Sequence, residues 1–163
     1  MTKIENIILD KLYENARIDL NDLAIMLDIS SVELANIIED MKKRKIICGY
    51  QAVINWDNTD REIVTALIEV KVTPQRGLGY DKIAERIYNF EEVDSIYLMS
   101  GGYDFMILIE GKSMREISRF VFEKLATLDM VNSTATHFVL KRYKDHGVKL
   151  VDSKKESRMI VSA

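Results

Sequence analysis

The chain has little of several things that would point to particular classes of protein. Among its 163 residues there is one cysteine, Cys48, so an internal disulfide and a zinc site built on several cysteines are both excluded. No apolar run approaches the roughly 20 residues that a membrane-spanning helix requires. The first residues carry acids and no small-residue cleavage site, unlike a signal peptide. We therefore expect a soluble, cytoplasmic protein that has no membrane partner.

The sequence also lacks the excess of basic residues that is typical of nucleic-acid-binding proteins. It has 23 Lys and Arg against 26 Asp and Glu, which gives a formal net charge of −3. This balance neither supports nor excludes DNA binding, because a basic face can lie on an acidic protein. Apolar residues make up 47% of the chain, enough for one medium domain or two small ones with real cores.

The first 45 residues predict three short helices. Apolar side chains recur at helical spacing over 4–14, 20–27 and 31–44, and Asp19 and Ser30 are suitable N-caps for the second and third helices. Two helices joined by a tight turn are typical of a helix-turn-helix domain, whose last helix lies in the DNA major groove. A three-helix bundle that binds nothing has the same pattern, and this alternative stays open.

The next segment predicts a connection between two domains. Residues 46–56 alternate loosely between apolar and polar side chains, which favours a strand, and 57–61 is short and polar. We therefore expect a helical domain over 1–45, a linking strand and hinge over 46–61, a second domain over 62–141 and a tail over 142–163.

The second domain predicts strands and helices in the order βαββαβ. The expected strands are 63–72, 93–99, 103–109 and 131–140, and the expected helices are 80–88 and a second one capped by Ser113, with Phe122 a candidate for its apolar face. This order is typical of the ferredoxin-like α+β fold, an antiparallel sheet with both helices on one face. The other face is then uncovered, which predicts self-association.

The tail over 142–163 is basic, with six Lys and Arg against three acids, and ends close to an apolar run at 159–161. It is either a disordered end or a short strand on the edge of a partner's sheet. The apolar run favours the strand.

Between the second and third strands, residues 100–104 read SGGYD. Gly101 and Gly102 supply the positive φ that a tight strand reversal needs. A polar, glycine-lined turn also leaves backbone N–H groups free to bind a small anionic group. The alternative is an ordinary hairpin turn.

Four stretches together resemble the Lrp/AsnC (leucine-responsive, feast/famine) family of transcriptional regulators. They are LDIS at 27–30, IICGYQAVIN at 46–55, SGGYD at 100–104 and STATHF at 133–138. The resemblance covers nearly the whole chain. It implies a winged helix-turn-helix that binds DNA and a C-terminal domain that forms homodimers, which assemble further, commonly to octamers. It also implies a small effector, usually an amino acid, bound between dimers near the SGGYD turn.

The chemistry of the turn suits an amino acid, which carries a carboxylate and an ammonium group. The N–H groups of Gly101 and Gly102 can hold the carboxylate, and Asp104 can pair with the ammonium. Asp104 is equally suited to bonding the backbone of its own turn, and threonines on a strand are often structural. The predicted effector-binding residues are Gly101, Gly102, Tyr103, Asp104, Thr134 and Thr136.

The third helix departs from the family pattern in its charge. From Ser31 to Met41 there is no Lys or Arg and there are three acids, and carboxylates repel phosphates. The run Lys42-Lys43-Arg44-Lys45 can grip phosphates, or it can simply stabilise the negative end of the helix dipole. Asn36 suits adenine and Ser31 a phosphate. The predicted DNA-binding residues are Ser30, Ser31, Glu33, Asn36, Ile37, Lys42, Lys43 and Arg44.

Three functions follow from these observations. The first is an effector-responsive regulator that binds DNA weakly, or that binds DNA together with a more basic paralogue in a hetero-oligomer. The second is a sensing or assembly module without DNA binding. The third is an enzyme, because relatives of this architecture include tetrapyrrole decarboxylases. Its candidate residues, Cys48, His137 and His146, have no known motif around them, so we expect no enzyme, cofactor or metal.

Overall fold

The computed structural model describes residues 1–74 and 79–151. The chain divides into two compact units, Met1–Val53 and Ile54–Ala163, which are described separately. None of the helices in the described part is long and apolar enough to cross a membrane.

The N-terminal unit consists of three helices, α1 (Lys3–Glu14), α2 (Leu20–Leu27) and α3 (Ser31–Lys43). Asp19 caps α2 by accepting from two backbone N–H groups, and the Ser30 hydroxyl accepts from the Glu33 N–H at 3.1 Å, as the sequence predicts. The three helices enclose an apolar core that contains Ile8, Leu12, Leu23, Ala24, Leu34, Ile38 and Met41.

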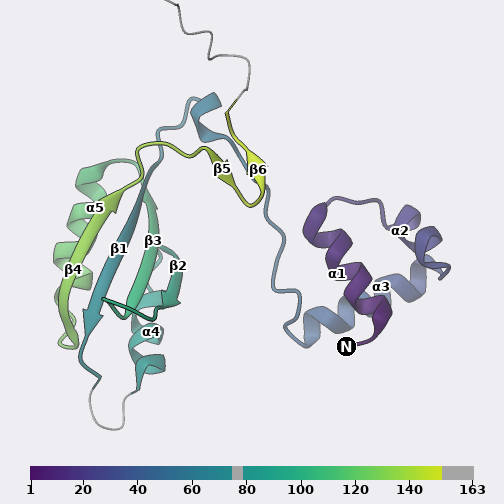
Figure 1. Ribbon diagram of the computed structural model, residues 1–163, viewed down its shortest axis with the longest axis horizontal. Helices are drawn as coiled ribbons and strands as arrows, with labels where there is room; N and C mark the ends of the chain where they lie inside the picture. The colour runs from purple at the N-terminus through teal and green to yellow at the C-terminus, as the bar shows by residue number, and fades with distance from the viewer. Residues whose placement is uncertain (75–78, 152–163) are drawn as a thin grey trace, which may run out of the picture. The chain divides into compact units, whose positions relative to one another are not determined.

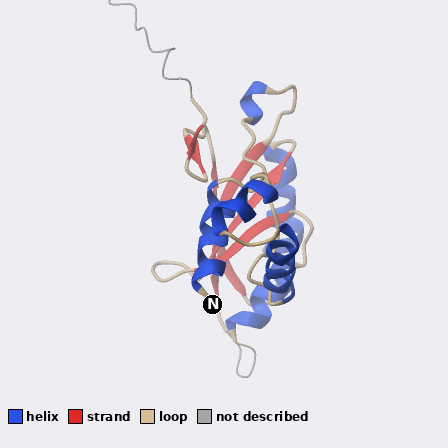
Figure 2. Ribbon diagram, turned by 90° about the vertical axis from the view of Figure 1, so that its right-hand side faces the viewer, coloured by secondary structure: helices blue, strands red, loops and turns tan. Residues whose placement is uncertain are grey.

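The predicted strand over 46–56 is wrong. Within residues 1–53, all of which are described, the structure has helices and no strand (Figure 2). The segment that follows contains only the short 3-10 helix η1 (Trp56–Asn58). A strand needs a neighbour to accept its backbone hydrogen bonds, and no described segment of this chain supplies one. Tyr50, Val53 and Ile54 consequently stay exposed.

The C-terminal unit contains the predicted antiparallel sheet. Its strands are β1 (Val64–Val72), β2 (Val93–Leu98), β3 (Phe105–Gly111) and β4 (Val131–Phe138), in the spatial order β2-β3-β1-β4 (Figure 1). In the register, Ile68 lies opposite Ile107 on one side and Thr136 on the other. The ferredoxin-like prediction is confirmed.

Both helices of this unit pack on one face of the sheet. They are α4 (Tyr80–Tyr88) and α5 (Met114–Phe120), and α5 continues as a π-helical turn, Val121–Leu125. Their core side chains include Ile83, Ile87, Ile117, Phe120 and Leu125, which meet alternate residues of β1 and β3. Phe122, a candidate for this face, is 75% exposed instead. The buried face is formed by Ile117, Phe120, Val121 and Leu125, and helical spacing places Phe122 to the side of that face.

The other face of the sheet is uncovered in the single chain. Because side chains alternate along a strand, the register assigns a group of apolar residues to this face: Leu67, Tyr97, Met106, Leu108 and Ala135. Each of them is half-buried or exposed.

After β4 the chain forms a small hairpin that the sequence analysis did not predict. Its strands are β5 (Lys144–Asp145) and β6 (Val148–Lys149). His146 and Gly147 turn the chain with φ of 42° and 84°, the positive values that a two-residue hairpin turn requires. Arg142 ties this region to the sheet through Thr65 and Glu110. The strand predicted at 159–161 lies outside the described residues.

Candidate effector site and DNA-binding helix

Asp104 holds the turn between β2 and β3 against the end of β1. Its Oδ2 accepts from the Val72 N–H at 2.8 Å, and its Oδ1 accepts from the Tyr80 hydroxyl at 3.1 Å. The Asp104 backbone N–H also donates to the Val70 carbonyl at 3.0 Å. Beyond the Val70 carbonyl, the Asp104 carboxylate therefore acts as the hydrogen-bond acceptor for β1 in place of a backbone carbonyl. It binds the Val72 N–H of β1 rather than an N–H of its own turn.

The two glycines before Asp104 leave open space. Gly101 has φ of +143°, which only glycine adopts freely, whereas Gly102 has no positive φ, so the predicted positive φ holds for Gly101 alone. An added Cβ at either residue would meet nothing within 4 Å. Both residues are exposed and the adjoining Tyr103 is half-buried, so a small molecule can approach this backbone closely.

The two threonines of β4 differ in their relation to the turn. Thr134 lies opposite Val70, whose carbonyl accepts from the Asp104 N–H, so Thr134 lies at the same end of the sheet as the turn. Thr136 lies opposite Ile68, two residues further away. Both belong to the helix-covered face and are half-buried. The structure brings Thr134 near the turn and leaves Thr136 further along β4.

The predicted DNA-contacting residues of α3 have varied surroundings. The hydroxyl of Ser31 donates to the Asn21 side chain of α2 at 2.8 Å, so it fixes the turn between the two helices. Glu33 and Asn36 are exposed and Ile37 is half-buried. Ser30 and Ser31 therefore have structural roles in addition to any contact with DNA.

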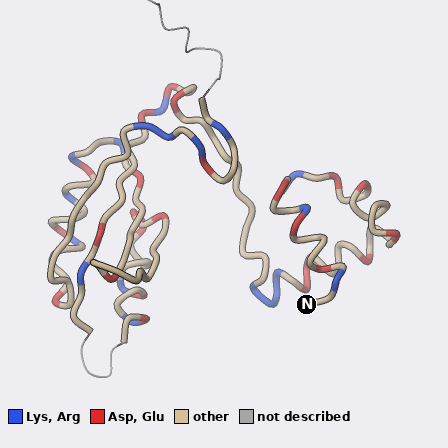
Figure 3. The backbone as a smooth tube through the Cα atoms, in the orientation of Figure 1, with Lys and Arg blue, Asp and Glu red and all other residues tan. Residues whose placement is uncertain are grey.

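The basic run at the end of α3 is partly neutralised within its own unit. Figure 3 shows this run as one continuous stretch of basic residues. Lys42 Nζ lies 2.8 Å from Glu39 Oε1, and Arg44 Nε lies 2.8 Å from Asp40 Oδ2. A hydrogen bond to Glu39 raises the pKa of Lys42. Within the described part of the chain, Lys43 and Lys45 have no acidic partner within 4.0 Å.

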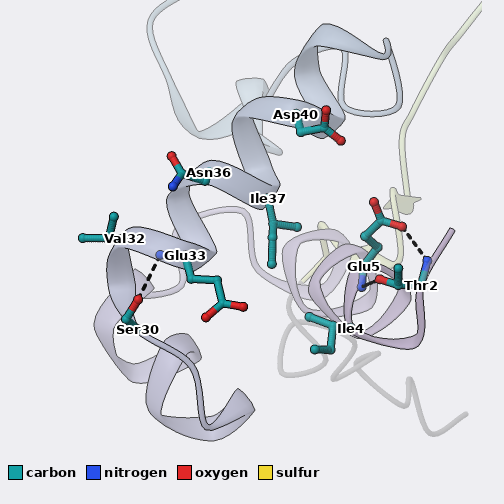
Figure 4. A pocket seen from close by; sticks show the side chains of 9 residues that line it. All are labelled: Thr2, Ile4, Glu5, Ser30, Val32, Glu33, Asn36, Ile37 and Asp40. Atoms are coloured by element: carbon teal, nitrogen blue, oxygen red, sulfur yellow. Dashed lines mark hydrogen bonds between the residues drawn. The ribbon is translucent and has the colours of Figure 1, made fainter.

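An open groove of about 610 Å³ runs along α3 beside the start of α1. Glu33 and Ile37 of α3 face Ile4 and Glu5 of α1 across it (Figure 4). With Asp40 at one end, the groove has carboxylates around an apolar floor, which does not suit the phosphates of DNA. The acidic character predicted from the sequence therefore extends beyond α3 to its neighbour.

Glu5 links the two helices that form this groove. It completes a capping box with Thr2, whose N–H donates to Glu5 Oε2 at 2.5 Å, and it pairs with Arg44 at the end of α3. The Thr2 N–H, and then Arg44, hold the pKa of the Glu5 carboxyl below its ordinary value of 4.5. Its ionised form is therefore favoured by folding.

We expect Glu5→Gln to lower the Tm of the N-terminal unit at pH 7. Glutamine keeps the capping hydrogen bond but loses the charge opposite Arg44. Because folding lowers the pKa of Glu5, the ionised Glu5 stabilises the folded state above about pH 4.5. This stabilisation is lost as the pH falls through the pKa that Glu5 has in the folded protein. The difference in Tm from the parent, measured by circular dichroism from pH 7 to pH 3, should therefore shrink on acidification. Glu14→Gln, at an exposed pair with Lys11, is the control. A difference that is independent of pH would contradict this assignment.

The residues that an enzyme would use have ordinary surroundings. His137 lies on the open face of β4 with its Nε2 3.3 Å from Glu69 of β1, His146 occupies the β5–β6 turn, and the Cys48 thiol donates to the Lys45 carbonyl at 3.2 Å. The three residues lie on separate segments. Among the described residues, no group of three or more His, Cys, Asp or Glu is placed to bind a metal.

Sequence reasoning missed the partners of Asp104. Val72 is 32 residues away along the chain and Tyr80 is 24 residues away. Tyr80 begins α4, and its ring packs edge-on against Phe105 with 5.9 Å between ring centres. No local pattern marks Tyr80, because the packing of α4 against the sheet, where its ring meets Phe105, brings it to Asp104.

The comparisons with known proteins agree with this fold. Residues 65–148 match the Lrp/AsnC ligand binding domain. The HTH-type transcriptional regulator YugG of Bacillus subtilis is 49% identical over 163 residues, 99% of this chain and 98% of its own. The leucine-responsive regulatory protein of Haemophilus influenzae is 27% identical over 84% and 82% of the two chains.

A solved structure shows the same architecture. A transcriptional regulator of Neisseria meningitidis in complex with L-Met superposes with a TM-score of 0.68, covering 89% of this chain and 93% of that one at 22% identity. The relatives are transcriptional regulators and not enzymes, which removes the tetrapyrrole decarboxylase alternative. Because the family model matches more than half of the chain and a relative is 49% identical along its length, this chain belongs to the Lrp/AsnC family of transcriptional regulators.

Proposed function

We propose that this protein is a cytoplasmic, DNA-binding transcriptional regulator whose C-terminal unit binds an amino acid at the turn 100–104. The observation that carries the proposal is that this turn presents hydrogen-bond donors for an anion next to a carboxylate that can bind a cation. Exposed backbone at Gly101 and Gly102 suits a carboxylate, and the Asp104 carboxylate beside it suits an ammonium group. The L-Met complex of the similarly folded regulator supports the same ligand class.

Tyr103 and Thr134 are proposed as further contacts. Tyr103 lies within the turn, and Thr134 lies at the same end of the sheet. Thr136 is kept as a more distant member of the site, since it is further along β4. Side chains of this kind decide which amino acid fits, because a polar group left unpaired in a closed site is costly.

The DNA-binding part of the proposal assigns contacts to the residues predicted in α3 and its basic end. Because Glu39 and Asp40 engage Lys42 and Arg44, we propose that a single copy binds DNA weakly. A hetero-oligomer with a more basic paralogue would then supply the missing phosphate contacts. The alternative, a sensing module without DNA binding, is favoured by the same ion pairs.

We also propose that two copies pair through the uncovered face of the sheet. The apolar residues of that face lie on all four strands of the sheet, with Leu67 opposite Leu108, Tyr97 opposite Met106 and Ala135 on β4. Covering such a face removes apolar surface from water. The family resemblance extends this to larger assemblies such as octamers. Sedimentation of the full chain measures the assembly, and a monomer at micromolar concentration would contradict it.

One experiment tests the regulator as a whole. The full chain is screened for a rise in Tm with each of the twenty standard L-amino acids, and its binding to its own promoter region is then measured at low salt by mobility shift with and without any amino acid that raises Tm. The proposal expects a rise in Tm with at least one amino acid and a change in DNA binding on its addition. Tight, sequence-selective binding by this chain alone would contradict the weak-binding part. Absence of any DNA binding would favour the sensing module.

A further inference from the structure

The two hydrogen bonds of the Asp104 carboxylate differ in how easily they can be exchanged. The Val72 N–H that reaches Oδ2 belongs to the backbone of β1, and Val72 is buried. The Tyr80 hydroxyl that reaches Oδ1 is a rotatable group on a side chain that is 37% exposed. Only the second donor can leave without disturbing the sheet.

The bond from Tyr80 is also long for its type. A hydroxyl that donates to a carboxylate typically lies at about 2.5–2.7 Å, whereas this one lies at 3.1 Å. The Tyr80 phenol is a neutral donor, and its hydrogen bond to Asp104 raises its pKa. An ammonium group is charged and binds a carboxylate more strongly than a neutral phenol does.

We propose that the ammonium group of a bound amino acid displaces the Tyr80 hydroxyl from Asp104 Oδ1, so that Tyr80 senses whether the site is occupied. The inference rests on the proposed function of the turn and adds a residue to it. The Val72 bond stays in place and keeps the turn folded, while the exchange occurs at one oxygen.

Tyr80 is placed to pass this change on, because it is the first residue of α4. That helix starts after Gly79 without any side-chain cap, so the hydroxyl bond to Asp104 is a tether between its first turn and the sheet. Further along, Ile83 and Ile87 anchor α4 in the core. Loss of the tether therefore frees the first turn and leaves the rest of the helix in place.

The test compares Tyr80→Phe with the parent chain by titration calorimetry, using each of the twenty standard L-amino acids that raises Tm. Removing the competing hydroxyl should tighten binding by about five-fold, the effect expected from one hydrogen bond. Tyr88→Phe is the matched control, since Tyr88 lies on the same helix, is 54% exposed and shows no hydrogen bond of its hydroxyl to any described residue. Its affinity should equal that of the parent.

A spectroscopic measurement separates displacement from a purely structural role. In protein labelled with 3-fluorotyrosine, the ¹⁹F resonance of Tyr80 is assigned by its absence in Tyr80→Phe, and it should move on addition of the amino acid while that of Tyr88 does not. Binding that is equal or weaker in Tyr80→Phe, or a Tyr80 resonance that stays in place, would overturn the displacement and leave the site intact. Failure of all twenty amino acids to bind the parent would overturn the site itself.

Discussion

Replacement of Asp104 by alanine is expected to weaken binding of the amino acid by about a hundredfold, the effect of losing a charged partner, and to destabilise the C-terminal unit. The second effect arises because the Val72 N–H would lose its acceptor at a buried position. A buried donor without a partner costs about 1–3 kcal/mol. The bond from Tyr80 would be lost as well, although its exposure makes that loss small.

Asp104→Asn separates these two effects. The asparagine oxygen can accept from the Val72 N–H, and its amide can donate to the Tyr80 oxygen, so the geometry of the turn is kept while the charge is removed. We expect this variant to retain most of the stability and to lose binding nearly as fully as the alanine variant.

The unfolding of this unit can be followed selectively. Trp56 is the only tryptophan of the chain and lies in the C-terminal unit, so its fluorescence during urea unfolding reports on that unit, while calorimetry measures binding. Full binding by Asp104→Asn would show that the carboxylate has a structural role alone. Unchanged stability in Asp104→Ala would show that the Val72 bond adds little.

The fold was largely predictable because local and periodic signals agreed with each other. Ser30 and Ser113 cap the helices that follow them, as predicted, and the predicted bounds of α2 and α4 coincide with those observed. Alternating apolar residues then identified β1 and β3, since one face of each is buried. These signals lie within a few residues of the structure that they specify.

The errors fall where structure depends on distant partners or on unusual turns. Residues 46–56 have strand-like composition, but composition does not supply a neighbouring strand. The β5–β6 hairpin turns at His146-Gly147 rather than at the usual Asn-Gly. Phe122 is apolar, but helical spacing places it to the side of the face that Ile117, Phe120 and Val121 bury, so its hydrophobicity alone was misleading.

The candidate site was only partly predictable for a related reason. Its glycines and Asp104 are adjacent in the chain, so a short motif revealed them. Val72 reaches Asp104 through the pairing of β1 with β3, and Tyr80 reaches it through the packing of α4 on the sheet. No local pattern specifies either arrangement. The ion pairs of Lys42 and Arg44 likewise required side-chain geometry, whereas the acidic composition of α3 was visible at once.

That acidic composition leads to a prediction on DNA binding. Glu39→Gln combined with Asp40→Asn should strengthen DNA binding at about 0.1 M salt by about tenfold for each additional phosphate that the protein neutralises. The slope of log K against log salt concentration should become steeper by up to about two. The change frees Lys42 from its 2.8 Å ion pair with Glu39. It also removes the charge of Asp40, one of the two acidic partners of Arg44, and leaves Glu5 as the other. It also removes two charges that repel phosphates.

The matched control removes the same charge from another helix. Asp10→Asn combined with Glu14→Gln takes two acids from α1 and releases Lys11 from its 2.8 Å pair with Glu14, so the net charge of the chain changes equally. Both double variants are titrated with the promoter fragment at several salt concentrations. Stronger binding by the α3 variant alone would locate the phosphate contacts at the end of that helix. An equal increase in both would attribute the effect to overall charge, and no increase in either would mean that the basic run at 42–45 stabilises the end of α3 without contacting DNA.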